Sequence, residues 1–285
     1  MKKIIVPIDF SEESLYALDY ASIWANKYKS DVQMVFVQTK KASHGITEKK
    51  EKENAKKQFA EIEKKYKEKF HKDCKFNYII KKGRVFEEVA EQVEAYDDSI
   101  VICTTHGESG WSNFFIGSNT YRIVEGTIRP VISIGVNQRH NKPKTIVMPI
   151  DITKETREKV PLVASIAKHF DAEVHILKVT SSTGEGIHNT LNLYAKQVAK
   201  YFDERDVKYK SSLIVGDNIT DVTIEYAKTV EANLIVFMTE QIKAWTNMLM
   251  GSYAQQMLNN SPIPVLSVTP YDITVRGGSF RTMGG

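Results

Sequence analysis

A glycine-containing loop near position 104 has residue types and spacing that could bind a phosphate group. The loop 104–110 reads Thr-Thr-His-Gly-Glu-Ser-Gly, and nine residues separate Gly107 from Gly117. Ser118 and Asn119 follow, where a helix is expected to begin. A glycine-containing loop that ends at a helix N-terminus exposes unpaired backbone N–H groups and the positive end of the helix dipole, so it suits phosphate. The same spacing is compatible with a structural turn in which Ser118 caps the helix.

Asp9 and His106 are the acidic and imidazole groups that such a site could use. Asp9 directly follows the first apolar run, and we expect it to cap a helix or hold the base of a ligand rather than act as a catalyst or metal ligand. His106 lies in the glycine loop without an identifiable carboxylate partner, so it is not assigned as a general base. The other histidines lack metal-ligand spacing such as H-x3-H. We therefore predict no catalytic residue and no metal site built from protein ligands.

Three familiar motifs for phosphate chemistry are absent from the sequence. The chain has no G-x-x-x-x-G-K-[ST] loop, and no G-x-G-x-x-G follows its first apolar run. A phosphorylated receiver domain would place an acceptor aspartate after the third strand, where the sequence reads Ile79-Ile80-Lys81-Lys82. These absences exclude a Walker-type site, a standard dinucleotide site and a receiver domain.

The elements that must position these residues alternate between strand and helix patterns. Five apolar runs with strand character are separated by helical periodicities, and they cover residues 3–8, 32–37, 76–80, 100–103 and 131–134. Parallel strands joined by helical crossovers form a doubly wound α/β sheet with helices on both faces. Ligands gather at the carboxyl ends of such strands, which is where Asp9 and the glycine loop fall.

The pattern occurs twice along the chain. Ile4–Ser11 returns as Ile146–Thr153, and Pro130–Ile134 returns as Pro264–Val268. The sequence therefore predicts two repeated domains, residues 1–140 and 141–270, followed by a glycine-rich flexible tail over 271–285. In the second copy Pro161 falls inside the first helical pattern, which predicts a kink or a late helix start.

Charge and composition exclude some partners. The 285 residues carry a formal net charge of +4, and lysines and glutamates interleave over residues 49–72. Within that segment a narrow apolar stripe recurs at steps of three and four, formed by Ala55, Phe59, Ile62, Tyr66 and Phe70. Mixed signs weaken the field that phosphate backbones require, so this segment is expected to be a solvent-facing helix rather than a nucleic-acid surface.

Membrane and redox features are equally sparse. No uncharged apolar stretch approaches the ~18–20 residues that span a bilayer. The N-terminal residues reach Pro7 and Asp9 too soon for a signal peptide. Two cysteines, Cys74 and Cys103, cannot build a disulfide framework or a zinc site by themselves, which favours a cytoplasmic location.

Taken together, these motifs resemble the universal stress protein family. They are the Val-Pro-Ile-Asp-Phe-Ser start, the Gly83 turn, the Thr-His-Gly loop with its gap to Gly-Ser, and the Pro-Val-Ile-Ser-Ile strand. The resemblance covers residues 2–136 and 144–269, as in a tandem member. It implies five-stranded sheets of strand order 3-2-1-4-5, of the adenine-nucleotide alpha-hydrolase-like type. Many members bind ATP through the pattern G-x2-G-x9-G-[ST].

The resemblance implies a nucleotide site in the first repeat. Asp9 and Val37 would lie beside adenine, while Gly117 and the residues after it would hold the phosphates, with which Mg²⁺ or Mn²⁺ could associate. The implied ligand-contacting residues are Pro7, Asp9, Val37, Cys103, Thr104, Gly107, Gly117, Ser118 and Asn119. Thr104 stands where the family has its first glycine, and its branched side chain argues against tight ATP binding.

The second repeat is eroded at the same positions. Met238 and Gln241 replace the first two glycines of the pattern, whereas Gly251-Ser252 and Asp151 remain. Family domains pair through their last strands, so residues 131–134 and 265–268 are expected to join the repeats as a pseudo-dimer. Further association into a homodimer stays open.

Three functional hypotheses follow from the sequence. The first is a cytoplasmic stress-response module that holds ATP, AMP or a related nucleotide in its first repeat and meets protein partners accordingly. The second is a slow ATPase on the same site, although the phosphate loop has no lysine or arginine. The third is a scaffold without nucleotide, in which both sites are vestigial.

Overall fold

The computed structural model describes residues 1–39, 45–105, 118–135, 141–153, 155–239, 241–243, 248–250 and 252–270. At residues 45–47, 118, 241–243 and 248–250 the description covers the backbone alone. The chain forms two compact units, Met1–Val136 and Asn137–Gly285. The expected tail 271–285 lies outside the described residues.

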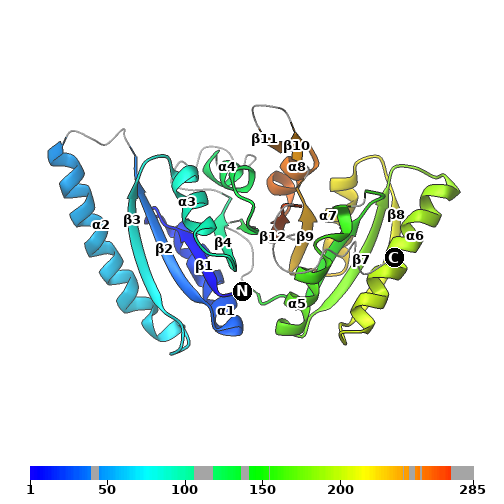
Figure 1. The fold of residues 1–285 in the computed structure, drawn as a ribbon, viewed down its shortest axis with the longest axis horizontal. Coiled ribbons are helices and arrows are strands. Elements are labelled where there is room, and N and C mark those ends of the chain that lie inside the picture. Colours follow the sequence, from blue (N-terminus) through cyan, green and yellow to red (C-terminus); the bar gives the residue numbers. More distant parts are fainter. Residues whose placement is uncertain are drawn as a thin grey trace. The chain divides into compact units, whose positions relative to one another are not determined.

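The first unit is built on a five-stranded parallel sheet. Its strand order is β3-β2-β1-β4-β5, and its strands are β1 (Lys3–Pro7), β2 (Asp31–Gln38), β3 (Phe76–Lys82), β4 (Ser99–Thr104) and β5 (Val131–Ile134). Figure 1 labels the first four of these in the order β3, β2, β1, β4. Strand β1 pairs with β2 on one side and β4 on the other, so Lys3 lies opposite both Asp31 and Ser99. The predicted doubly wound sheet of order 3-2-1-4-5 is confirmed.

Four α-helices connect these strands. They are α1 (Glu12–Tyr28), α2 (Gly45–Tyr66), α3 (Val85–Glu94) and α4 (Ser118–Gly126), with a short 3-10 helix η2 (Lys67–Lys69) after α2. Helix α1 begins where the Ser11 hydroxyl accepts the Ser14 amide at 3.1 Å, and Glu12 and Glu13 add negative charge to its first turn. The helix ends at Lys29 in the left-handed conformation, with φ 53°.

Helix α2 confirms the expected solvent-facing helix with one apolar stripe. The stripe residues Ala55, Phe59, Ile62, Tyr66 and Phe70 are at most 8% exposed. The Phe59 ring stacks on Tyr78 of β3 at 4.2 Å between centroids. The helix ends at Tyr66, earlier than the lysine-rich sequence suggested. Burial of the stripe, rather than the charged face, therefore attaches this helix to the sheet.

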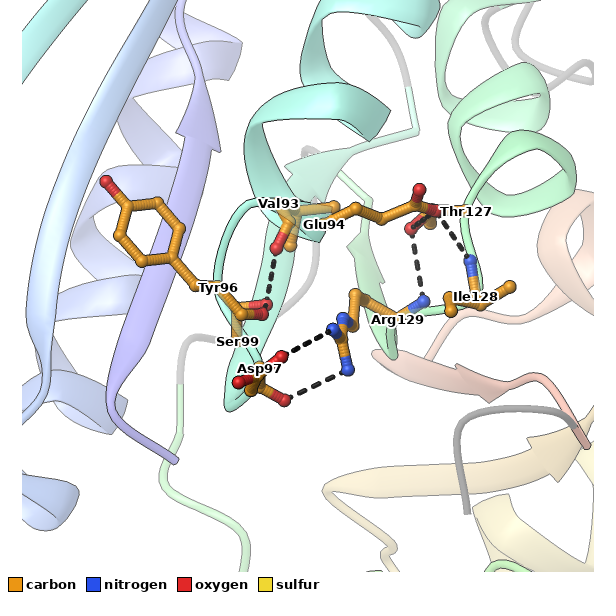
Figure 2. Close-up of polar contacts among 8 residues, drawn as sticks. All are labelled: Val93, Glu94, Tyr96, Asp97, Ser99, Thr127, Ile128 and Arg129. Atoms are coloured by element: carbon orange, nitrogen blue, oxygen red, sulfur yellow. Dashed lines mark hydrogen bonds and ion pairs between the residues drawn. The ribbon is translucent and has the colours of Figure 1, made fainter. Parts of the chain in front are cut away.

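Polar contacts join the amino-terminal ends of β4 and β5 (Figure 2). The Glu94 carboxylate accepts the Thr127 hydroxyl and the Ile128 amide, both at 3.2 Å. Arg129 donates from Nη1 to the Asp97 carbonyl at 2.9 Å and from its amide to the Thr127 hydroxyl at 3.1 Å. These bonds tie the end of α3 to the segment between α4 and β5, at the edge of the sheet opposite the strand ends that carry Asp9 and Thr104.

The second unit repeats the parallel sheet. Its order is β8-β7-β6-β9-β12, formed by β6 (Thr145–Ile150), β7 (Glu173–Thr180), β8 (Tyr209–Val215), β9 (Leu234–Met238) and β12 (Val265–Val268). After β9 it adds an antiparallel pair, β10 (Gln241–Lys243) with β11 (Met248–Met250). Its helices are η3 (Glu155–Arg157), α5 (Val160–Phe170), α6 (Glu185–Asp203), α7 (Ile219–Thr229) and α8 (Ser252–Asn260).

The late start of the first helix in the second unit is confirmed. Helix α5 begins at Val160 with Pro161 in its first turn, after the 3-10 turn η3. Lys159, which corresponds to Ala17 of α1, is 1% exposed, and its Nζ lies 2.5 Å from the Thr156 carbonyl oxygen. Pro161 has no amide hydrogen to donate, which suits the first turn of a helix and agrees with a start at Val160.

Candidate functional site

The candidate site lies where the strand order of the first unit reverses. Strands β1 and β4 are neighbours in space, but in the described sequence between them lie β2 and β3, the helices α1, α2 and α3, and the 3-10 helix η2. Their carboxyl ends are Pro7 and Thr104. In open parallel sheets this edge, at the switch point, is where ligands bind.

Asp9 is held in a fixed orientation immediately after β1. Its Oδ1 accepts the Ser11 amide at 3.1 Å and the Ser11 hydroxyl at 2.5 Å, and Ser11 in turn caps α1. The side chain is exposed, and Oδ2 makes no hydrogen bond to any residue that the structure describes. Asp9 therefore orients the capping residue Ser11 rather than capping the helix itself, and within the described part of the chain its Oδ2 has no hydrogen-bond partner.

Phe10 is a feature that sequence reasoning missed. Its φ is 69°, a left-handed value that costs a non-glycine residue about 1–2 kcal/mol. The ring packs against Phe36 of β2 and Phe59 of α2, each at 4.9 Å between centroids. This aromatic cluster holds the strained turn next to Asp9. Nothing in the sequence signals it, because phenylalanine is not a residue associated with positive φ.

The first turn of α4 is anchored to the end of β4. The Thr120 hydroxyl donates to the Thr104 carbonyl at 2.6 Å, and both residues are buried. The Thr105 amide continues the sheet by donating to the Ile134 carbonyl at 2.8 Å. As a result, the helix N-terminus that begins at Ser118 lies at the carboxyl edge of the sheet, and Asn119 is exposed there. Thr120 was not among the predicted site residues, although its place in the first turn could have indicated it.

The other predicted residues differ in accessibility. Pro7 is half-buried, whereas Val37 is 7% exposed. Cys103 is 4% exposed, its Sγ lies 3.8 Å from the Ile132 carbonyl oxygen, and burial raises the pKa of the thiol to about 12. Cys103 is therefore an un-ionised core thiol at neutral pH. The glycines Gly107 and Gly117, like His106, lie outside the described residues.

The second unit retains the aspartate that follows its first strand, but it lacks the threonine hydroxyl that anchors the helix after the fourth strand. Asp151 Oδ1 accepts the Thr153 amide at 2.7 Å and its hydroxyl at 2.5 Å, as Asp9 does with Ser11. Met238 and Ala254 occupy the positions of Thr104 and Thr120, so the hydroxyl that would attach α8 to the end of β9 is missing. Gly251 lies outside the described residues. These differences agree with the expected erosion of the second site.

Lys159 gives the second unit a buried amine near its aspartate. Burial lowers the pKa of Lys159 from 10.5 to about 7, and the Asp151 carboxylate opposes part of this shift. The equivalent position of the first unit, Ala17, has no charge. The two strand-end regions therefore differ in electrostatics, which the motif comparison by itself did not reveal.

The part of the chain that the structure describes contains neither a cluster of metal ligands nor a membrane-spanning helix. Within it, no group of three or more histidine, cysteine, aspartate or glutamate side chains is arranged to hold a metal ion. None of the helices in these ranges is long and apolar enough to span a membrane.

The fold defines a duplicated, doubly wound α/β architecture, and a family model identifies its family. The family model described as the universal stress protein family matches residues 1–134 and again residues 142–269. The chain belongs to the universal stress protein family, with two such domains in tandem.

Individual relatives agree with this assignment. The chain is similar to a curated universal stress protein of Methanocaldococcus jannaschii, with 28% identity over 147 residues that cover 47% of this chain and 86% of the relative. Among solved structures, it is similar to a universal stress protein from Archaeoglobus fulgidus DSM 4304, with a TM-score of 0.77, 17% identity, and coverage of 94% and 98% of the two chains. A putative universal stress protein from Pseudomonas aeruginosa UCBPP-PA14 has a TM-score of 0.68, 15% identity and coverage of 96% and 95%. At these identities the structural likeness establishes the fold.

Proposed function

We propose that the first repeat binds an adenine nucleotide, ATP or AMP, and that the protein acts as a nucleotide-responsive regulatory module in the stress response. The observation that carries this proposal is the hydrogen bond from Thr120 to the Thr104 carbonyl. It holds the N-terminus of α4 at the carboxyl edge of the sheet, where backbone N–H groups and the helix dipole favour phosphate.

Asp9 supplies the second half of such a site. With Oδ1 engaged by Ser11, the carboxylate has one orientation, and Oδ2, which bonds to none of the described residues, would accept the amino or hydroxyl donors of an adenine nucleoside. The nucleotide would thus extend from Asp9, after β1, to the first turn of α4, after β4. These strands are neighbours in the sheet, so a single ligand can reach both.

Thr104, the departure from the family pattern, is compatible with this arrangement. All six residues of β4 are buried, and Thr104 itself is 9% exposed. Its methyl and hydroxyl groups are thus largely covered. Mg²⁺ or Mn²⁺, if present, would associate with the phosphates of the ligand, where it would supply charge neutralisation.

The experiment compares equivalent aspartates in the two repeats. Asp9→Ala and Asp151→Ala remove the same local turn bonds, but only Asp9→Ala is expected to weaken ATP binding, by at least tenfold. In the wild type, ATP at 100 times its dissociation constant should stabilise the protein by about 2.7 kcal/mol, which a thermal shift detects. If the wild type shows no shift and releases no nucleotide on denaturation, the proposal is wrong.

The second candidate function is a scaffold that binds no nucleotide. The residues of the second unit favour this function for the second repeat. Its anchor threonine is replaced by Ala254, and Met238 stands at the strand end. We infer that this repeat binds protein partners instead of a nucleotide. Pairing of residues 131–134 with 265–268, association into a homodimer and a cytoplasmic location stay predictions. Equal ATP affinity of a Thr104→Gly variant and the wild type would show that the first site is not impaired by its threonine.

A further inference from the structure

The second unit contains a continuous chain of polar side chains that the proposed nucleotide site does not use. His175, on β7, is 5% exposed and lies between two partners. Its Nδ1 is 2.9 Å from the Tyr226 hydroxyl, on α7, and its Nε2 is 3.0 Å from Glu173 Oε1. The Tyr226 hydroxyl is also 3.0 Å from Ser212 Oγ, on β8. Two adjacent strands and a helix are therefore connected through one imidazole.

The partners of the ring determine which nitrogen carries the proton. Lys210 Nζ lies 2.9 Å from Glu173 Oε1, and its hydrogen bond keeps the pKa of this carboxyl below 4.5, so Glu173 is ionised at neutral pH. An ionised carboxylate can only accept hydrogen bonds, so Nε2 of His175 must donate. In the neutral ring Nδ1 is then the acceptor, and the Tyr226 hydroxyl must donate to it.

The direction of the remaining bond follows. Because the Tyr226 proton points to His175, the Tyr226 oxygen receives the proton of Ser212 Oγ. When His175 gains a proton, both of its nitrogens become donors. Tyr226 must then accept from Nδ1 and donate to Ser212, and the half-buried Ser212 hydroxyl turns its proton to another acceptor.

The first unit provides a natural comparison at the equivalent positions. Gln33 and Gln92 stand where the second unit has His175 and Tyr226. Gln92 Nε2 donates to Gln33 Oε1 at 2.8 Å, and Gln33 Nε2 donates to Asn77 Oδ1 at 3.1 Å. Amide groups do not titrate near neutral pH, so this chain has one direction at all pH values.

Few other groups act on the ring. In the strand register His175 lies between Val147 of β6 and Lys210 of β8, and Lys210 is exposed and paired with Glu173. On α7 the charged pair Glu225–Lys228 is engaged with itself at 2.7 Å, and both side chains are exposed. Among the residues that the structure describes, the ionisable groups in contact with His175 are thus Glu173 and Tyr226.

We propose that His175, Tyr226 and Ser212 form a proton-controlled relay, in which protonation of His175 reverses the direction of the hydrogen bonds that join β7, α7 and the edge strand β8. The relay depends on whether the His175 ring carries one proton or two, and histidine is the side chain commonly used for such a change. It makes the second repeat pH-sensitive, at a position where the first repeat is not.

Nuclear magnetic resonance with labelled histidine and tyrosine tests the relay in the full chain. At pH 8 the two ¹⁵N shifts of His175 should show the proton on Nε2. Between pH 8 and pH 5 the Tyr226 Cζ resonance should shift with the same midpoint as the His175 ring. The side-chain amide resonances of Gln33 and Gln92 serve as internal controls and should not follow this midpoint.

Two variants complete the test. His175→Gln should abolish the titration of Tyr226, and the double variant H175Q/Y226Q, which recreates the amide pair of the first unit, keeps the test valid if the single variant fails to fold. In the double variant the Ser212 amide resonance should become independent of pH between 5 and 8. A proton on Nδ1 at pH 8, or a Tyr226 resonance that titrates in His175→Gln as in the wild type, would overturn the proposal.

Discussion

At the scale of single residues, equivalent positions in the two repeats share local bonds but differ in their surroundings. Asp9 and Asp151 each accept an amide and a hydroxyl from the residue two positions later. The following residues diverge, since Phe10 packs into an aromatic cluster with positive φ, whereas Ile152 is 48% exposed. Such pairs allow each substitution to be compared with a matched one in the same molecule.

The conformation of Phe10 leads to a prediction about glycine. Phe10→Gly should be less destabilising than Phe10→Ala by about 1 kcal/mol, because glycine adopts a φ of 69° without a Cβ clash. Urea unfolding of both variants measures the difference. At Ile152, which has no positive φ, the order should reverse and alanine should be better tolerated than glycine. The same order at both positions would contradict the assigned strain.

Lys159 predicts how stability changes with pH. Its pKa is about 7 in the folded state, against an ordinary value of 10.5 that applies to the unfolded chain, so between these values the unfolded chain holds a proton that the folded chain has lost. The cost of burying the amine is full below pH 7 and disappears toward pH 10.5, so the free energy of unfolding should rise with pH by roughly 1 kcal/mol per unit over this window.

Variants of this lysine separate its contribution from other titrations. Lys159→Met should remove that rise and stabilise the protein at pH 7, as measured by urea unfolding at several pH values. Lys168→Met, at an exposed position of the same helix, is the control and should leave the slope unchanged. An unchanged slope in Lys159→Met would show that the amine is charged when folded.

At the scale of elements, short polar contacts decide where helices begin. Helix α1 begins at Glu12, directly after its cap Ser11, whereas α5 begins at Val160 with Pro161 in its first turn and no side-chain cap bond from Lys159. Helix α4 depends on a side-chain contact in its first turn, the bond from Thr120 to the Thr104 carbonyl.

The α4 anchor can be removed by changing one hydroxyl. Thr120→Val should destabilise the first unit by about 1–2 kcal/mol, since a buried hydrogen bond is lost while the shape is kept. It should also weaken ATP binding, because the helix N-terminus is no longer held at the strand end. Thr120→Ser keeps the hydroxyl and should restore most of both properties in thermal unfolding and titration. Wild-type behaviour of Thr120→Val would refute the role of this bond.

At the scale of the whole molecule, the two repeats have the same fold but carry different polar and ionisable groups. The first unit has the anchored helix and the free carboxylate oxygen, whereas the second has a buried amine and the His175 chain. Each unit is a doubly wound sheet with its own apolar core. We therefore expect ligands and protons to act on different halves of the chain.

Hydrogen exchange can localise the effect of nucleotide. ATP should slow amide exchange at the ends of β1 and β4 and in the first turn of α4, because bound phosphate engages these N–H groups and stabilises the first unit. Peptides covering β7, α7 and β8 should change little. Equal protection of both units would mean that the nucleotide acts on the molecule as one body, against this expectation.

Several features of the structure could not be predicted from the sequence. The contact of Phe10 with Phe59 joins segments that are far apart in the chain. The end of α2 at Tyr66 and the pairing of β10 with the nearby β11 are local features that no motif in the sequence indicated. The burial of Lys159 was not predicted from the sequence, since burial is a property of what packs around a position.

By itself, the order of amino acids determined the duplicated parallel sheets and the location of the candidate site. Alternating apolar runs and helical periodicities allow few topologies, and the carboxyl ends of neighbouring strands must meet at one edge. The tertiary structure alone decided which groups meet there and in what state. Hydrogen-bond partners such as Thr104 with Thr120, and the burial that alters Lys159, arise from distances that no local pattern encodes.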